Sequence, residues 1–122
     1  MSQNIKPSVW GPHGWKFMHY VSLGYPEHPT ETDKLHYKEF YESLQHILPC
    51  GACSQNYKQN LREIPIENSL GSKDELIQWV IDIHNKVNIE TGKKPYDHDK
   101  ALALYLNYQS PLVEYGFKLL IL

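Results

Sequence analysis

Both cysteines of this 122-residue chain lie in one short stretch, LPCGAC at residues 48–53. Two thiols separated by two residues are typical of either a redox-active disulfide or half of a metal site. Pro49 disfavours helical geometry in the residue before it, and residues 51–62 have the pattern of a helix. We therefore predict that Cys50 and Cys53 lie at the N-terminus of this helix.

A position at a helix N-terminus favours redox chemistry. The free backbone amides and the helix dipole stabilise a thiolate there, which lowers the pKa of a thiol. Cysteines three residues apart also share one helical face, so their sulfur atoms lie within reach of each other. Zinc needs four ligands, and the chain has no second Cys-x-x-Cys to supply the other two.

The rest of the chain predicts an all-α fold, because apolar residues recur at helical spacing and no stretch before the last twelve residues alternates with a period of two. Pro12 suits the first turn of a helix, and Ser72 begins a capping box whose helix Gly92 would end. Asp97 would cap a last, short helix. The predicted helices cover residues 12–23, 32–47, 51–62, about 73–91 and about 100–107.

The chain is predicted to consist of a tail, a folded domain and a C-terminal segment. We expect a flexible polar tail over residues 1–9 and one folded domain over residues 10–110. Residues 111–122 form an apolar segment whose conformation the pattern leaves open. This segment would lead into a further domain if the chain is a piece of a longer protein.

The composition is that of a small globular domain. Charged residues make up 21% and hydrophobic residues 41% of the chain, and the net charge is -2, so nothing points to binding of nucleic acid or of an anionic membrane. No apolar run is typical of a signal peptide or a transmembrane segment. Nine tyrosines, three tryptophans and seven histidines are a surplus of flat rings, which a core or a bound aromatic cofactor would absorb.

Two further helical faces carry unusual polar groups. His84 and Asn88 share a face of the fourth predicted helix, where burial is costly unless hydrogen bonds are made. A heteroaromatic ligand with ring nitrogens, carbonyls and a diphosphate would make them, whereas the plainer interpretation is a solvated helix end. Trp15 and His19 share a face of the first helix, where the plainer interpretation is an aromatic core stripe with one hydrogen-bonded histidine.

Several short motifs follow one another in a specific order. They are WGPxxWxxxH at residues 10–19, YP at 25–26, PCxxC at 49–53, QW at 78–79, HNxVN at 84–88 and GKKPYD at 92–97. In this order and at this spacing the chain resembles the Erv/ALR family of FAD-linked sulfhydryl oxidases, and it looks most like the short viral members. The resemblance covers most of the chain.

The resemblance implies a four-helix bundle with a short fifth helix and FAD bound within the bundle. It implies that the cofactor is held by residues of the first, fourth and fifth helices and of the loop between the last two. Helical spacing from Cys53 adds a residue of the third helix, Tyr57. The implied cofactor-binding residues are Trp10, Gly11, Trp15, His19, Tyr57, His84, Asn85, Val87, Asn88, Lys93, Lys94, Lys100 and Tyr105.

The resemblance also implies a reaction. Cys53 would lie against the flavin, and Cys50, nearer to solvent, would exchange with the thiols of a protein substrate. Molecular oxygen would take the electrons and give hydrogen peroxide, with no metal involved. A homodimer would form through a helical face near the first two helices, and the surplus of aromatic residues around Tyr37 and Tyr41 is compatible with such a face. A viral member would act in the host-cell cytoplasm or in the virion.

The residues leave two other functions open. One is a non-catalytic helical module whose cysteines bind zinc together with His46 or His84. The other is a thiol–disulfide exchanger that uses no flavin. Flavin absorbance, bound zinc and exchange activity of the purified protein distinguish the three.

Overall fold

The computed structural model describes residues 4–95, 97, 99, 100 and 103 of the chain. This part of the chain is helical and contains no strand, which confirms the predicted all-α class. The elements are α1 (Pro7–Leu23), α2 (Glu31–Ile47), α3 (Gly51–Glu63), the short 3-10 helix η1 (Ile66–Ser69) and α4 (Lys73–Glu90).

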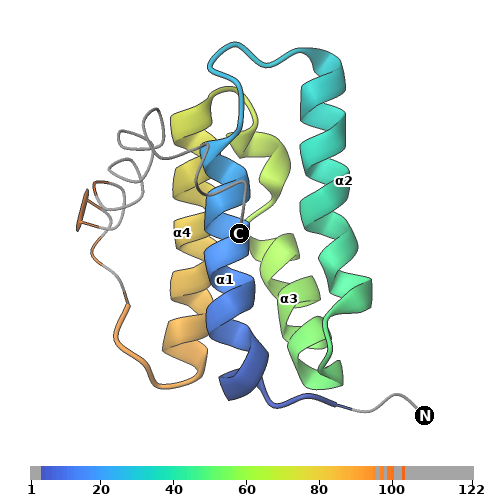
Figure 1. The fold of residues 1–122 in the computed structure, drawn as a ribbon, viewed down its shortest axis with the longest axis vertical. Helices are drawn as coiled ribbons and strands as arrows, with labels where there is room; N and C mark the ends of the chain where they lie inside the picture. Colours follow the sequence, from blue (N-terminus) through green and yellow to red (C-terminus); the bar gives the residue numbers. More distant parts are fainter. Residues whose placement is uncertain (1–3, 96, 98, 101–102, 104–122) are drawn as a thin grey trace, which may run out of the picture.

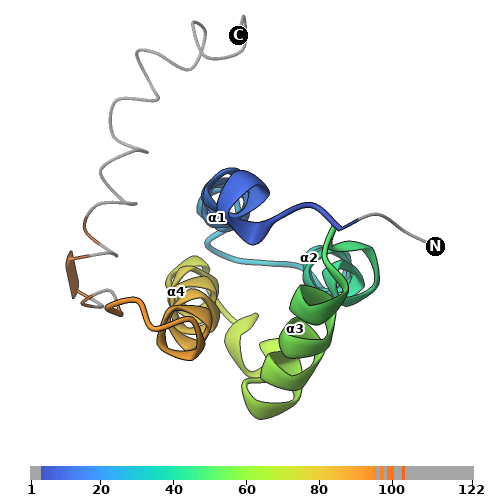
Figure 2. The ribbon, with the colours of Figure 1, turned by 90° about the horizontal axis from the view of Figure 1, so that it is seen from below.

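The four α-helices form a bundle of two pairs. Helix α1 packs against α4 and helix α2 against α3, while α3 and η1 both contact α4. Seen end-on, the α1–α4 pair and the α2–α3 pair lie on opposite sides of the bundle (Figure 1, Figure 2). None of the described helices combines the length and the apolar character that spanning a bilayer requires.

The ends of α4 follow the local rules that the sequence indicated. The hydroxyl of Ser72 accepts a hydrogen bond from the Glu75 amide at 3.2 Å, as an N-cap does. The predicted capping box is only half formed, because the Glu75 carboxylate accepts from the Ser72 hydroxyl at 3.2 Å instead of from the Ser72 amide. At the other end Gly92 has a φ of 77°, and the Lys93 amide donates to the Asn88 carbonyl at 2.7 Å. This is the Schellman arrangement, for which glycine is favoured because a side chain strains a positive φ.

Helix α1 starts earlier than predicted. It begins at Pro7, where proline occupies the first helical turn, and Pro12 lies inside the helix. Residues 4–9 therefore differ from the predicted tail, since residues 7–9 are helical and Ile5 donates a backbone hydrogen bond to the Pro49 carbonyl at 2.8 Å. Pro7 suits the first turn of a helix as well as Pro12 does, and the sequence analysis did not consider it.

The predicted fifth helix lies largely outside the described residues, as does the whole of residues 111–122. The side chain of Asp97 accepts a hydrogen bond from the Lys100 amide at 3.0 Å. This bond is the one predicted for a helix cap at Asp97.

Buried ring side chains tie the elements together through main-chain carbonyls. The Tyr57 hydroxyl on α3 donates to the Tyr41 carbonyl on α2 at 2.6 Å, and the Tyr41 hydroxyl donates to the Met18 carbonyl on α1 at 2.7 Å. The Trp79 indole on α4 donates to the Ile64 carbonyl at 2.9 Å. Burial raises the pKa of both tyrosines, which keeps them protonated as donors.

The burial of Tyr41 bears on the expected dimer face near the first two helices. Tyr41 is fully buried in the core, with 0% of its surface exposed, and Tyr37 is half-buried against Tyr25. Tyr41 therefore packs within the bundle and does not contribute to an outer face of the molecule.

Candidate functional site

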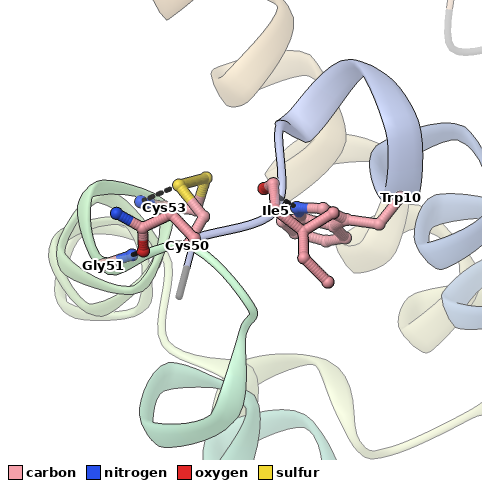
Figure 3. The surroundings of a disulfide bond; sticks show 6 residues. Ile5, Trp10, Cys50, Gly51 and Cys53 are labelled. Carbon is pink, nitrogen blue, oxygen red and sulfur yellow. Dashed lines mark hydrogen bonds between the residues drawn. A yellow bond between two sulfur atoms is a disulfide. The ribbon is translucent and has the colours of Figure 1, made fainter. Parts of the chain in front are cut away.

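The two cysteines form a disulfide at the start of α3, as the spacing predicted. Cys50 is the N-cap residue with an extended backbone, and Cys53 lies in the first turn. The Cys53 amide donates to the Cys50 sulfur at 3.3 Å, so one of the free amides of the helix N-terminus already points at that sulfur (Figure 3). This position is suited to stabilising a thiolate after reduction.

The exposure of the two cysteines differs from the predicted order. Cys50 is only 9% exposed, whereas Cys53 is half-buried. Residues before α1 bind the main chain on either side of Cys50: the Ile5 amide donates to the Pro49 carbonyl at 2.8 Å, and the Gly51 amide donates to the Asn4 side chain at 3.1 Å. Contacts between residues so far apart in sequence leave no local signal.

A cavity of about 570 Å³ adjoins the disulfide. Its walls come from α1, α3 and the C-terminal half of α4, and both cysteines border it. Ten of the predicted site residues line it: Trp10, Gly11, Trp15, Cys50, Cys53, Tyr57, His84, Val87, Asn88 and Lys93. Residues far apart in the chain, from three helices, therefore meet at one place.

The other five predicted residues do not line this cavity in the described structure. His19 is buried behind His84, Asn85 is partly buried beside it on α4, and Lys94 and Lys100 are exposed beyond the end of α4. Tyr105 lies outside the described residues.

Further lining residues were missed by the sequence interpretation. They are Pro7, Pro12, Lys16, Met18, Tyr20, Leu48, Ala52, Asn56, Glu90 and Thr91. Pro12, Lys16 and Tyr20 follow one another at intervals of four along α1, and Asn56 lies three residues after Cys53 on α3. Helical spacing would have found Pro12 and Met18 from Trp15, and Asn56 from Cys53.

Trp15 on α1 and His84 on α4 line the cavity side by side, and His19 lies behind them. The rings of Trp15 and His84 stack with centroids 4.1 Å apart and planes only 5° apart. His19 Nε2 lies 3.0 Å from His84 Nδ1, and an N–H···N bond requires that one of these nitrogens accept. His19 thus holds the ring of His84 in position.

Both histidines are neutral at physiological pH. Burial, together with the charge of His84, lowers the pKa of His19 to about 3. Burial and the nearby Lys93 lower the pKa of His84 to about 4. A neutral ring keeps a nitrogen lone pair for hydrogen bonding and a flat face for stacking.

The residues present fit the predicted cofactor. Ligand cavities of this size usually combine apolar and aromatic walls with a few polar groups that fix orientation. Here Trp10, Trp15 and Tyr57 offer rings, and Asn88 offers an amide that is 6% exposed. Lys16 and Lys93 supply positive charge at the same cavity, as a diphosphate requires.

A metal site has less support. Nowhere in the described part of the chain do three or more histidine, cysteine or acidic residues gather as metal ligands. These residues therefore provide no ligand set around the cysteines for the zinc-binding module that the sequence left open.

Fold and site together define a small helical domain with a Cys-x-x-Cys disulfide in the wall of a ring-lined cavity. The sequence pattern of the Erv1 / Alr family matches residues 12–106, and the chain belongs to this family. The resemblance inferred from the ordered motifs is thereby confirmed, including its likeness to viral members.

Named relatives extend this finding. The chain is 46% identical over 99 residues to a probable FAD-linked sulfhydryl oxidase of Acanthamoeba polyphaga mimivirus, covering 80% of this chain and 69% of that protein. It is 38% identical over 79 residues to an FAD-linked sulfhydryl oxidase of Arabidopsis thaliana, covering 65% of this chain and 40% of that protein. The chain thus spans less than half the length of the plant relative.

Solved structures agree with the fold. The FAD binding domain of Erv1 from Saccharomyces cerevisiae superposes with a TM-score of 0.78 at 28% identity, covering 84% of this chain and 95% of that one. The yeast Erv1 core gives a TM-score of 0.77 at 28% identity, covering 84% and 86%.

The neutral histidine pair predicts a pH dependence of stability. In the unfolded chain a histidine has a pKa of about 6.5. In the folded protein the pKa is about 3 for His19 and about 4 for His84. As the pH falls below about 6.5, the unfolded state therefore binds protons before the folded state does. We expect the free energy of unfolding to fall as the pH drops from 7 to 5, by up to about 1.4 kcal/mol per pH unit for each histidine. Urea unfolding at several pH values measures this.

Matched variants locate the effect. His84→Gln should reduce the pH slope, whereas His46→Gln, at an exposed position on α2, should leave it unchanged. An equal slope for all three proteins would contradict the assignment.

Proposed function

We propose that this protein is an FAD-dependent sulfhydryl oxidase that forms disulfides in thiol-containing protein substrates. The observation that carries the proposal is the Cys50–Cys53 disulfide in the wall of the ring-lined cavity. The names of the mimivirus and plant relatives support the same activity and cofactor.

The chain's own residues perform the thiol exchange. A substrate thiolate attacks the Cys50 sulfur, the Cys50–Cys53 bond breaks, and Cys53 leaves as a thiolate in the first turn of α3. A second substrate thiolate then attacks the substrate sulfur of the mixed disulfide and releases Cys50. The substrate loses two electrons and two protons, and the cysteine pair gains the two electrons.

Cys53 is assigned to the cofactor side. It lies four residues before Tyr57, so both share the face of α3 that borders the cavity. The cofactor would be held by Trp10, Trp15, Asn88 and Lys93, with His84 fixed by His19. Bound FAD would supply the acceptor for the electron pair and the redox chemistry with molecular oxygen that gives hydrogen peroxide.

Replacing Cys53 tests the reaction. We expect Cys53→Ser to abolish oxygen consumption with a dithiol substrate, because the cysteine pair can no longer cycle, while the protein keeps its fold and its flavin absorbance. Ser54→Ala, at the next position of α3, is the matched control and should retain turnover. Full turnover of Cys53→Ser would refute the assigned roles.

Replacing His84 tests the cofactor site. We expect His84→Ala to lower the flavin content of the purified protein, because it removes the ring that stacks on Trp15 and borders the cavity. The ratio of flavin to protein absorbance measures this, with the exposed His46→Ala as control. Flavin content equal to that of the unchanged protein would remove His84 from the site.

We extend the proposal to a homodimer through the outer face of α1 and α2. Phe17 on α1 is 59% exposed and lies edge-on to Phe40 of α2, and Leu35 on α2 is 52% exposed. We expect Phe17→Glu to give a monomer in sedimentation velocity, because a charge at an apolar contact is costly to bury. Ile89→Glu, at a 64% exposed position on α4, should leave the dimer intact. A monomeric unchanged protein would contradict this part of the proposal.

A further inference from the structure

The residues before α1 lie against the loop that carries Cys50. The Ile5 amide donates to the Pro49 carbonyl at 2.8 Å, and the Gly51 amide donates to the side-chain oxygen of Asn4 at 3.1 Å. Figure 2 shows this segment passing from α1 toward the α2–α3 side of the bundle. The main chain is therefore bound on both sides of Cys50 by two consecutive residues, which we name the N-terminal strap.

The strap is fixed at its other end to the cavity wall. The Trp10 indole donates to the Ile5 carbonyl at 3.0 Å, and the Trp10 ring lines the cavity (Figure 3). The Lys6 carbonyl accepts from the Val9 amide at 2.8 Å, which joins the strap to the first turn of α1. The strap thus connects α1 to the start of α3 beside the disulfide.

This arrangement bears on the approach of a substrate. A thiolate must reach the attacked sulfur along an open path, so the exchange rate depends on access as well as on chemistry. Cys50 keeps only 9% of its surface exposed, although its neighbour Gly51 is exposed and the strap itself lies on the surface. Asn4 is exposed and Ile5 is 47% exposed, so both can move without unpacking the core.

We propose that Asn4 and Ile5 determine substrate specificity: by binding the main chain on both sides of Cys50, they restrict the approach of bulky thiol substrates to its sulfur. This inference rests on the proposed function, in which Cys50 meets the substrate. Small dithiols reach the sulfur with the strap in place, and a protein thiol requires the strap to open. The strap is thus a selective element for the exchange step and takes no part in the transfer of electrons.

The test measures access to Cys50 directly. The flavin-bound protein is reduced, kept under anaerobic conditions and alkylated with iodoacetamide or with a bulky maleimide, and modification of each cysteine is followed by mass spectrometry. Asn4→Ala removes one strap hydrogen bond, and Ile5→Pro removes the other by removing the amide hydrogen. We expect each variant to raise the rate at which the bulky maleimide alkylates Cys50 about fivefold, which is the effect of losing one net hydrogen bond. The rate of alkylation at Cys53 should change little.

A control and a second measurement separate access from general loosening. Ile5→Ala keeps the amide and should alkylate like the unchanged protein. Asn4→Ala should raise kcat/KM for a reduced, unfolded protein about fivefold without raising it for dithiothreitol. Equal alkylation rates in all variants, or equal gains for both substrate sizes, would overturn the inference. Alkylation needs no oxidase activity, so a failure of the strap and a failure of the proposed function give different results.

Discussion

The start of α3 is the constraint on which the rest of the structure depends. Leu48 ends α2 with an extended backbone, Pro49 follows, and Cys50 caps the next helix with another extended backbone. So short a connection makes α2 and α3 neighbours in the bundle and leaves no freedom in where the first turn of α3 begins. The disulfide spans that first turn, so its position is set by the helix connection.

Buried hydrogen bonds then hold the cavity walls at fixed distances from that turn. The bonds from Tyr57 to Tyr41 and from Tyr41 to Met18 connect α3 through α2 to α1. The contact between His19 and His84 connects α1 to α4. Each of these polar groups would be costly to bury without its partner, so the bonds favour one arrangement of the helices over other packings. A site on such helices is formed before any ligand arrives.

Sequence reasoning succeeded where local chemistry decides the structure. Ser72, Gly92 and the i, i+3 spacing of the cysteines act within one or two helical turns, and the structure has them as predicted. Sequence reasoning failed where contacts between residues distant in the chain determine the structure. The hydrogen bond from Ile5 to the residue before Cys50 joins positions 44 residues apart, and the helical spacing that found Tyr57 carries no information on whether Asn85 or Lys94 faces the cavity.

Trp10 shows how one residue can serve both the strap and the cavity. Its ring lies so close to Gly14 that a Cβ atom there would be 3.1 Å from the ring, closer than ordinary contacts. A Cβ atom at position 14 would require the Trp10 ring to shift by a few tenths of an ångström, and this ring carries the indole nitrogen that donates to the Ile5 carbonyl at 3.0 Å. The absence of a side chain at Gly14 therefore permits Trp10 to border the cavity and to hold the strap in one conformation.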